Sequence, residues 1–140
     1  MAEKQRVLFV CTHNSARSQM AEGLLRHLAG DRYEVYSAGT VATRVNPFAI
    51  RAMAERGIDI SQHTSDHIDR FMGQDFDIVI TVCDHAKETC PYFPATREQL
   101  HWSFEDPAAA QGSDEAILQE FRRIRDQIEQ RIREFLAQRS

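Results

Sequence analysis

The residues of this chain best suited to chemistry are a cysteine followed six positions later by an arginine and a serine. They belong to the stretch Cys11-Thr12-His13-Asn14-Ser15-Ala16-Arg17-Ser18, between an apolar run and a helical pattern. A short loop that opens a helix directs backbone N–H groups inward, and with the helix N-terminus they favour a bound anion. Arg17 adds a planar fork of donors that suits two oxygens of a tetrahedral oxyanion. The same positive field favours a nucleophilic thiolate at Cys11, to which Ser18 can donate a hydrogen bond.

The elements around this loop predict how it is held. Unbroken apolar runs at 7–10 and 76–82 are typical of buried parallel strands, and residues 33–38 are expected to form a further strand. Apolar and polar residues alternate over 100–104, which indicates an edge strand. Helical spacing follows the loop up to Gly30, starts again at Asn46-Pro47, and recurs from Ile117 to Phe135. A shorter helix is expected from about Asp66.

This alternation predicts an α/β fold: one domain over 1–140 with a doubly wound, four-stranded parallel sheet and helices on both faces. Ligands of such sheets bind beyond the carboxyl ends of the strands. Cys11, Cys83 and Asp106 each follow a predicted strand, so we expect them to meet at one edge of the sheet. Asp106, followed by Pro107, is either a simple turn or a general acid that protonates a leaving oxygen.

Composition excludes several classes of function. The chain has 140 residues, 42% of them hydrophobic and 27% charged, with a net charge of −4 that argues against non-specific nucleic-acid binding. Its N-terminus lacks a signal-peptide core, and no apolar run reaches membrane-spanning length. Three cysteines are a poor framework for secreted disulfides, so we expect a cytoplasmic protein, with a monomer as the default.

The spacing of Cys83 and Cys90 limits what the two thiols can do. Seven residue steps along an intact helix span about 10.5 Å, whereas a disulfide needs Cα atoms within about 7 Å. A bridge therefore requires this segment to loop out, which would make it a redox switch for a reductase partner. The alternatives are two unrelated thiols, or a zinc site with His85 that lacks a clear fourth ligand.

Several segments together resemble one family, the thioredoxin-coupled arsenate reductases built on the low-molecular-weight tyrosine phosphatase fold. The resemblance covers essentially the whole chain and rests on VLFVCTHNSARSQMAEG at 7–23, SAGT at 37–40, GIDISQHTSDHID at 57–69, TVCDHAKETCP at 81–91 and WSFEDPA at 102–108. It implies arsenate as substrate, reduction to arsenite for arsenic detoxification, thioredoxin as reductant and no tightly bound cofactor. A glutaredoxin or mycothiol system remains an alternative electron donor.

The resemblance also implies roles for individual residues. Cys11 would attack arsenate, residues 12–18 would hold its oxygens, and Asp106 would assist departure of an oxygen. Cys83 would then release arsenite by forming a Cys11–Cys83 disulfide, and Cys90 would convert it into a Cys83–Cys90 disulfide for thioredoxin.

Some members of that family bind a potassium ion beside the loop. The matching positions here carry oxygen donors, which suit a hard cation: Asn14, Glu22, Ser37, Thr64 and Asp66. The same side chains would equally form a hydrogen-bond network without an ion.

Two rival functions remain at this point. A tyrosine phosphatase is disfavoured because such relatives usually have a second cysteine where Ala16 stands and an aromatic residue where Ala108 stands. Weak phosphatase activity is nevertheless expected, since phosphate and arsenate are near-isosteres. A redox sensor or anion-binding module without turnover is the other rival.

Overall fold

The computed structural model describes residues 4–84 and 92–139. The strands are β1 (Gln5–Cys11), β2 (Tyr33–Gly39), β3 (Ile78–Thr81) and β4 (Glu98–His101). The helices are α1 (Arg17–Ala29), α2 (Pro47–Ala54) and α3 (Asp114–Ala137), with short 3-10 helices η1 (Ile68–Phe71) and η2 (Pro107–Ala109). Cys90 and the predicted Cys83–Cys90 disulfide lie outside the described residues, as does His85 of the zinc alternative.

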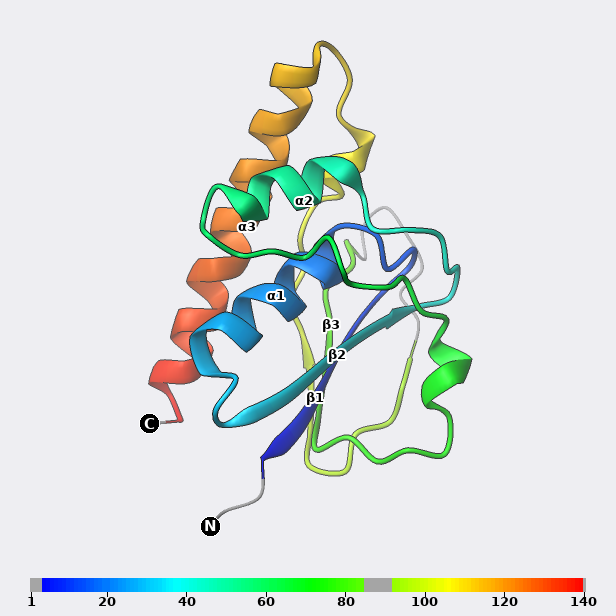
Figure 1. The fold of residues 1–140 in the computed structure, drawn as a ribbon. Coiled ribbons are helices and arrows are strands. Elements are labelled where there is room, and N and C mark those ends of the chain that lie inside the picture. Colours follow the sequence, from blue (N-terminus) through cyan, green and yellow to red (C-terminus); the bar gives the residue numbers. More distant parts are fainter. Residues whose placement is uncertain (1–3, 85–91, 140) are drawn as a thin grey trace.

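The four strands form one parallel sheet in the order β2-β1-β3-β4 (Figure 1). This confirms the predicted α/β fold with a four-stranded parallel sheet. Strand β1 is central, and its Phe9 lies opposite Ser37 of β2 and Ile80 of β3. The edge strand β4 ends at His101, earlier than the alternation predicted. Trp102 and Phe104 follow it and are both buried in the core.

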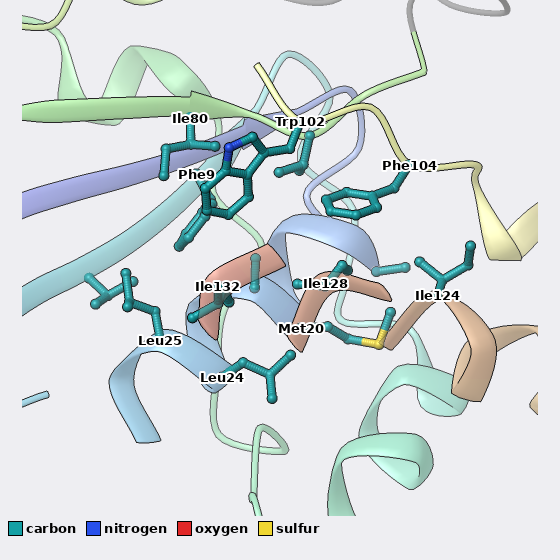
Figure 2. Close-up of a cluster of buried hydrophobic side chains, with 14 of the residues drawn as sticks. Phe9, Met20, Leu24, Leu25, Ile80, Trp102, Phe104, Ile124, Ile128 and Ile132 are labelled. Carbon is teal, nitrogen blue, oxygen red and sulfur yellow. The ribbon is translucent and has the colours of Figure 1, made fainter. Parts of the chain in front are cut away.

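Three α-helices pack on one face of the sheet, where they enclose the larger core (Figure 1). Figure 2 shows Phe9 and Ile80 of the sheet facing the side chains of α1 and α3. The fully buried contributions are Met20 and Leu25 from α1 and, from α3, Ile124, Ile128 and Ile132. Helix α3 contacts both α1 and α2, so its apolar stripe closes the core, as the periodicity predicted.

The second face of the sheet carries a smaller, largely aromatic core. It consists of Leu8, Val10, Ala38, Phe71, Phe76, Val79 and Phe93. Here the covering elements are the 3-10 helix η1 and irregular chain, so helices lie on both faces but unequally. The connection from β1 to β2 carries α1 on the first face, whereas the longer connection from β2 to β3 passes through α2 on that same face and then through η1 on the second.

Local capping signals place the helix starts where the sequence predicted them. The side chain of Asn46 accepts a hydrogen bond from the Phe48 amide at 2.8 Å, with Pro47 in the first turn of α2. Ser113 caps α3 in the same way, and Asp114 and Glu115 follow in its first turn. Among the described residues, none of the helices combines the length and apolar character needed to cross a bilayer.

Candidate active site

The loop between β1 and α1 combines a thiol with a helix N-terminus. Cys11 is the last residue of β1, and Arg17 is the first residue of α1. The residue before the helix, Ala16, provides no side-chain cap, and the first turn contains no acidic residue. Neither a capping side chain nor an acidic side chain thus competes for the first turn of α1, and a helix N-terminus of this kind favours an anion.

Two groups hold the Cys11 sulfur as a hydrogen-bond acceptor. Cys11 is a buried free thiol whose Sγ lies 2.9 Å from Ser18 Oγ, and the Asn14 amide donates to it at 3.3 Å. Asn14 Nδ2 also donates to Ser18 Oγ at 2.8 Å. That contact uses a lone pair of the hydroxyl and leaves its hydrogen free to point at the sulfur. This arrangement suits a thiolate, because every polar neighbour named here donates to it.

Asn14 is the residue that fixes the shape of the loop. It is fully buried and has a φ of +48°, in the left-handed region that asparagine tolerates better than most residues. Its Oδ1 accepts from the Asp66 amide at 2.7 Å. Gly39 at the end of β2 lies against the same loop, where a Cβ would come within 2.6 Å of the Thr12 carbonyl oxygen and 2.9 Å of the Asn14 nitrogen.

Arg17 is buried and oriented by the chain that follows β4. Its Nη1 donates to the Phe104 carbonyl at 3.1 Å, and its Nη2 lies 3.8 Å from Asp106 Oδ2. The carboxylate and the guanidinium thus belong to one cluster, although they are 89 positions apart in the numbering (106 − 17). Asp106 also accepts from the Ala108 amide at 3.0 Å, which is the predicted turn. Asp106 is therefore both a turn residue and a neighbour of the loop arginine.

A cavity of about 610 Å³ opens beside the loop. Its described lining is Thr12, His13, Asp84, Glu105, Asp106, Ala109, Ala110, Gln111 and Glu120. None of these residues is a phenylalanine, tyrosine or tryptophan, and four of them are acidic. The structure therefore brings Asp106 to the same cavity as the first residues of the loop, as the strand-end argument predicted.

Cys83 lies buried beside the strand that ends at Cys11. The ladder between β1 and β3 continues past Thr81, because the Val82 amide donates to the Val10 carbonyl at 3.0 Å. Cys83 Sγ lies 3.9 Å from that same carbonyl oxygen. The sulfur of this second cysteine thus lies next to the residue that precedes Cys11.

The residues matched to a potassium site surround a second, smaller cavity of about 250 Å³. Glu22, Ser37, Thr64 and Asp66 line it, whereas Asn14 reaches this region only through its hydrogen bond to the Asp66 amide. Both carboxylates of the set already have cationic partners, Arg26 for Glu22 at 2.6 Å and Arg70 for Asp66 at 2.7 Å. Across 4–84 and 92–139, no group of three or more His, Cys, Asp or Glu side chains is arranged to hold a metal ion.

Three contacts that shape the site were not predicted from the sequence. The first is Gln19, which is buried and donates to the carbonyls of Asn14 at 3.0 Å and Thr64 at 2.9 Å. The others are the close approach of Gly39 and the acceptor at the Phe104 carbonyl. Only the position of Gly39 at the end of a predicted strand was a signal, because glycine there permits close backbone approach.

Comparison with known proteins agrees with this geometry. The family model described as low molecular weight phosphotyrosine protein phosphatase matches residues 6–139. The chain belongs to this phosphatase family. An arsenate reductase of Halalkalibacterium halodurans is 52% identical over 132 residues, which cover 94% of this chain and 95% of that protein.

Solved structures resemble this family member over nearly its whole length. An arsenate reductase in its phosphate-binding state has a TM-score of 0.79 and 37% identity, covering 97% of this chain and 99% of the other. A thioredoxin-dependent arsenate reductase of Corynebacterium glutamicum has a TM-score of 0.73 and 30% identity, covering 98% of this chain and 62% of the other. The likeness to this phosphatase family thus extends through all four strands and three α-helices.

Proposed function

We propose that this chain is an arsenate reductase that uses thioredoxin as its reductant and serves arsenic detoxification in the cytoplasm. The proposal rests on relatives that are named arsenate reductase and cover about 95% of the chain, one with 52% identity. It also rests on the site: the Cys11 thiol, the loop at the start of α1, the Asp106 carboxylate and a second cysteine, Cys83, lie at one edge of the sheet.

In the first step, the Cys11 thiolate attacks the arsenic atom of arsenate. The loop amides and Arg17 hold the oxygens of the anion, as backbone donors at a helix N-terminus and a guanidinium fork are suited to do. Asp106 supplies the proton with which one oxygen leaves as water. The product is a covalent adduct with a bond between Cys11 sulfur and arsenic(V).

In the second step, the Cys83 thiolate attacks the Cys11 sulfur of this adduct. The sulfur–arsenic bond breaks, its electron pair stays on arsenic, and arsenite leaves with arsenic reduced from +5 to +3. A Cys11–Cys83 disulfide takes up the oxidation. The observation that carries the proposal is the position of Cys83, buried at 3.9 Å from the carbonyl of the residue before Cys11.

In the third step, Cys90 attacks Cys83 and releases the Cys11 thiolate. The resulting Cys83–Cys90 disulfide is then reduced by thioredoxin through ordinary thiol–disulfide exchange. This relay gives each cysteine of the chain one role.

A role as a phosphatase of tyrosine-phosphorylated proteins is less well supported. The described lining of the 610 Å³ cavity has no phenylalanine, tyrosine or tryptophan to flank a phosphotyrosine ring. A small phosphatase side activity on aryl phosphates is still expected, because its chemistry needs only the loop, Cys11 and Asp106.

The test is arsenate-dependent consumption of NADPH with thioredoxin and thioredoxin reductase, run beside a glutaredoxin-coupled assay. We expect turnover with the thioredoxin system, and none after Cys11→Ser. Cys83→Ser and Cys90→Ser should abolish turnover but keep hydrolysis of p-nitrophenyl phosphate, which serves as the matched control for an intact loop. Multiple turnovers by the Cys83 variant would contradict the relay, and no turnover by the wild type with either donor would indicate a sensor or binding module.

A further inference from the structure

Beside the cavity that family resemblance associates with potassium, an arginine is paired with one of the cavity's carboxylates, Glu22. Arg26 extends from α1 toward the neighbouring strand, and its Nη2 donates to Glu22 Oε2 at 2.6 Å and to the Val35 carbonyl at 2.5 Å. Its Nη1 lies 3.1 Å from His63 Nε2. One guanidinium thus joins helix α1, strand β2 and the segment that carries His63.

The oxygen donors of the set are engaged with one another and with arginines. Ser37 Oγ donates to Glu22 Oε1 at 2.5 Å, and Thr64 Oγ1 lies 3.1 Å from both carboxylate oxygens of Asp66. Arg70 donates to one of those Asp66 oxygens at 2.7 Å. The hydroxyl groups are therefore oriented as donors to carboxylates and not as ligands that converge on a central ion.

The charges around this cavity balance without a metal ion. Glu22 and Asp66 contribute two negative charges, and Arg26 and Arg70 contribute two positive charges. Burial lowers the pKa of His63 below its ordinary value, which keeps that imidazole neutral near pH 7. A potassium ion would enter a region with no net negative charge and with two guanidinium groups to repel it.

A chain of hydrogen bonds leads from Arg26 to the anion-binding loop. Arginine only donates, so His63 Nε2 must accept from it and His63 Nδ1 carries the proton. His63 Nδ1 lies 3.1 Å from Gln19 Oε1, and Gln19 Nε2 donates to the Asn14 carbonyl at 3.0 Å. The guanidinium thereby sets the tautomer of His63 and the orientation of the Gln19 amide that supports the loop.

We infer that Arg26 replaces potassium in this chain, and that it is a positioning residue for the anion-binding loop through His63 and Gln19. The residues present do not fit an added monovalent cation. Anion binding should therefore be independent of potassium. The inference concerns the same loop as the proposed arsenate reduction, but it depends only on anion binding and stability.

The test measures two quantities in potassium, sodium or choline chloride at equal ionic strength. One is the Tm, and the other is the dissociation constant of inorganic phosphate, obtained from its protection of Cys11 against iodoacetamide. For the wild type we expect the same values in all three salts. A rise in Tm or tighter phosphate binding specific to potassium would overturn the inference, because a bound ion stabilises the state that binds it.

Variants separate positioning from general stability. Arg26→Ala should weaken phosphate binding at least about fivefold in choline chloride, the lower end of typical coupling between sites. Arg26→Lys should restore most of it, because it returns a positive charge beside Glu22. Arg133→Ala is the matched control: it also removes an exposed arginine that pairs with a glutamate four residues away, Glu129, on α3. An Arg26→Ala variant with wild-type phosphate binding would refute the positioning role.

These readouts do not require turnover. A chain that fails to reduce arsenate but shows potassium-independent phosphate binding would contradict the proposed function and leave this inference standing. A chain that reduces arsenate but binds phosphate more tightly in potassium would support the proposed function and contradict this inference.

Discussion

Ser18 connects the geometry of the loop to the reactivity of Cys11. Its hydroxyl oxygen accepts a hydrogen bond from Asn14 Nδ2 at 2.8 Å and lies 2.9 Å from the Cys11 sulfur. The single hydrogen of the hydroxyl can therefore be donated to that sulfur. Hydrogen bonds to a charged group favour the charged form. The nucleophile is thus prepared by a neighbour seven residues along the chain.

We expect Ser18→Ala to slow alkylation of Cys11 by iodoacetamide at pH 7. The hydroxyl is a hydrogen-bond donor beside the sulfur, and the loss of a donor to a charged acceptor typically costs about 1.5–3 kcal/mol. The measurement is the pseudo-first-order alkylation rate across pH, with Ser113→Ala, a change at a distant helix cap, as the control. An unchanged rate would mean that the Asn14 amide alone holds the thiolate.

Asp106 is the proton donor of the proposed reaction. It lines the cavity with Thr12 and His13, and its Oδ2 lies 3.8 Å from Arg17 Nη2. For Asp106→Asn, we expect the limb of the pH–rate profile that reports the catalytic acid to disappear, because the amide cannot give up a proton. The measurement is the initial rate of arsenate-dependent oxidation over pH 5–9, and a profile that keeps both limbs would exclude the acid role.

At the scale of the elements, the end of β2 sets the position of the loop. Gly39 carries a backbone bond from its amide to the Asp66 carbonyl at 2.9 Å, and it lies so close to the loop that any side chain would meet backbone atoms. Backbone atoms cannot rotate away, so the loop itself would have to move. Strand β2 is therefore part of the site although it contributes no reacting side chain.

Gly39→Ala should weaken anion binding and lower the Tm together. The added Cβ would lie 2.6 Å from the Thr12 carbonyl oxygen, well inside van der Waals contact, and displacing the loop disturbs the amides that bind the anion. The measurement is phosphate protection of Cys11 combined with thermal unfolding. A variant that keeps both values would show that the loop can shift without loss of its binding geometry.

A second link between elements joins α2 to α3 through Glu55. Hydrogen bonds from Arg122, and secondarily from Arg125, lower the pKa of the Glu55 carboxyl below its ordinary value of 4.5. A carboxyl whose pKa is lower in the folded state stabilises the fold above the unfolded value and loses this contribution as the pH falls through the folded value. The link is therefore strongest at neutral pH.

Glu55→Gln should lower the Tm by a few degrees at pH 7, and the difference from the wild type should shrink as the pH falls below about 4.5. Thermal unfolding between pH 3 and pH 7 measures both effects. The double variant Glu55→Gln/Arg122→Gln should lose less than the sum of the two single variants, because both remove the same contact. A difference that stays constant with pH would exclude this ion pair as its source.

At the scale of the whole molecule, the sheet separates two cores of different composition. The face on which the described residues form no α-helix is held by aromatic rings, and Phe76 lies at the centre of this group, 5.6–5.7 Å from the rings of Tyr36, Phe71 and Phe93. The guanidinium of Arg6 covers the Phe76 ring at 4.4 Å. These contacts attach the segments 68–76 and 93–95 to the sheet.

Phe76→Ala should reduce the free energy of unfolding by about 3–5 kcal/mol, the range for a buried phenylalanine. Chemical denaturation measures this change, and Met72→Ala is the matched control because Met72 is 64% exposed. We expect little change in the control. A loss below about 1 kcal/mol for Phe76 would mean that the second face repacks without its central ring.

The sequence by itself determined the features that depend on neighbouring residues. The apolar strand runs, the cap at Asn46 and the apolar stripe of α3 are all local patterns, and the structure contains each of them. The parallel direction of the strands followed from their alternation with helices, whereas their order across the sheet was not predicted from the sequence. The spacing of Cys11, Arg17 and Ser18 likewise predicted an anion loop at a helix start.

Only the tertiary structure decided which distant groups satisfy one another. The sequence did not decide whether the five oxygen-bearing side chains form an ion site or a hydrogen-bond network. It also did not predict the contacts of Arg26 with His63 and with the Val35 carbonyl. Nor did it indicate that Phe104 orients Arg17. Local periodicity encodes which face of an element is apolar, whereas the partner of a polar group depends on how separate elements pack, and that is set by the whole chain at once.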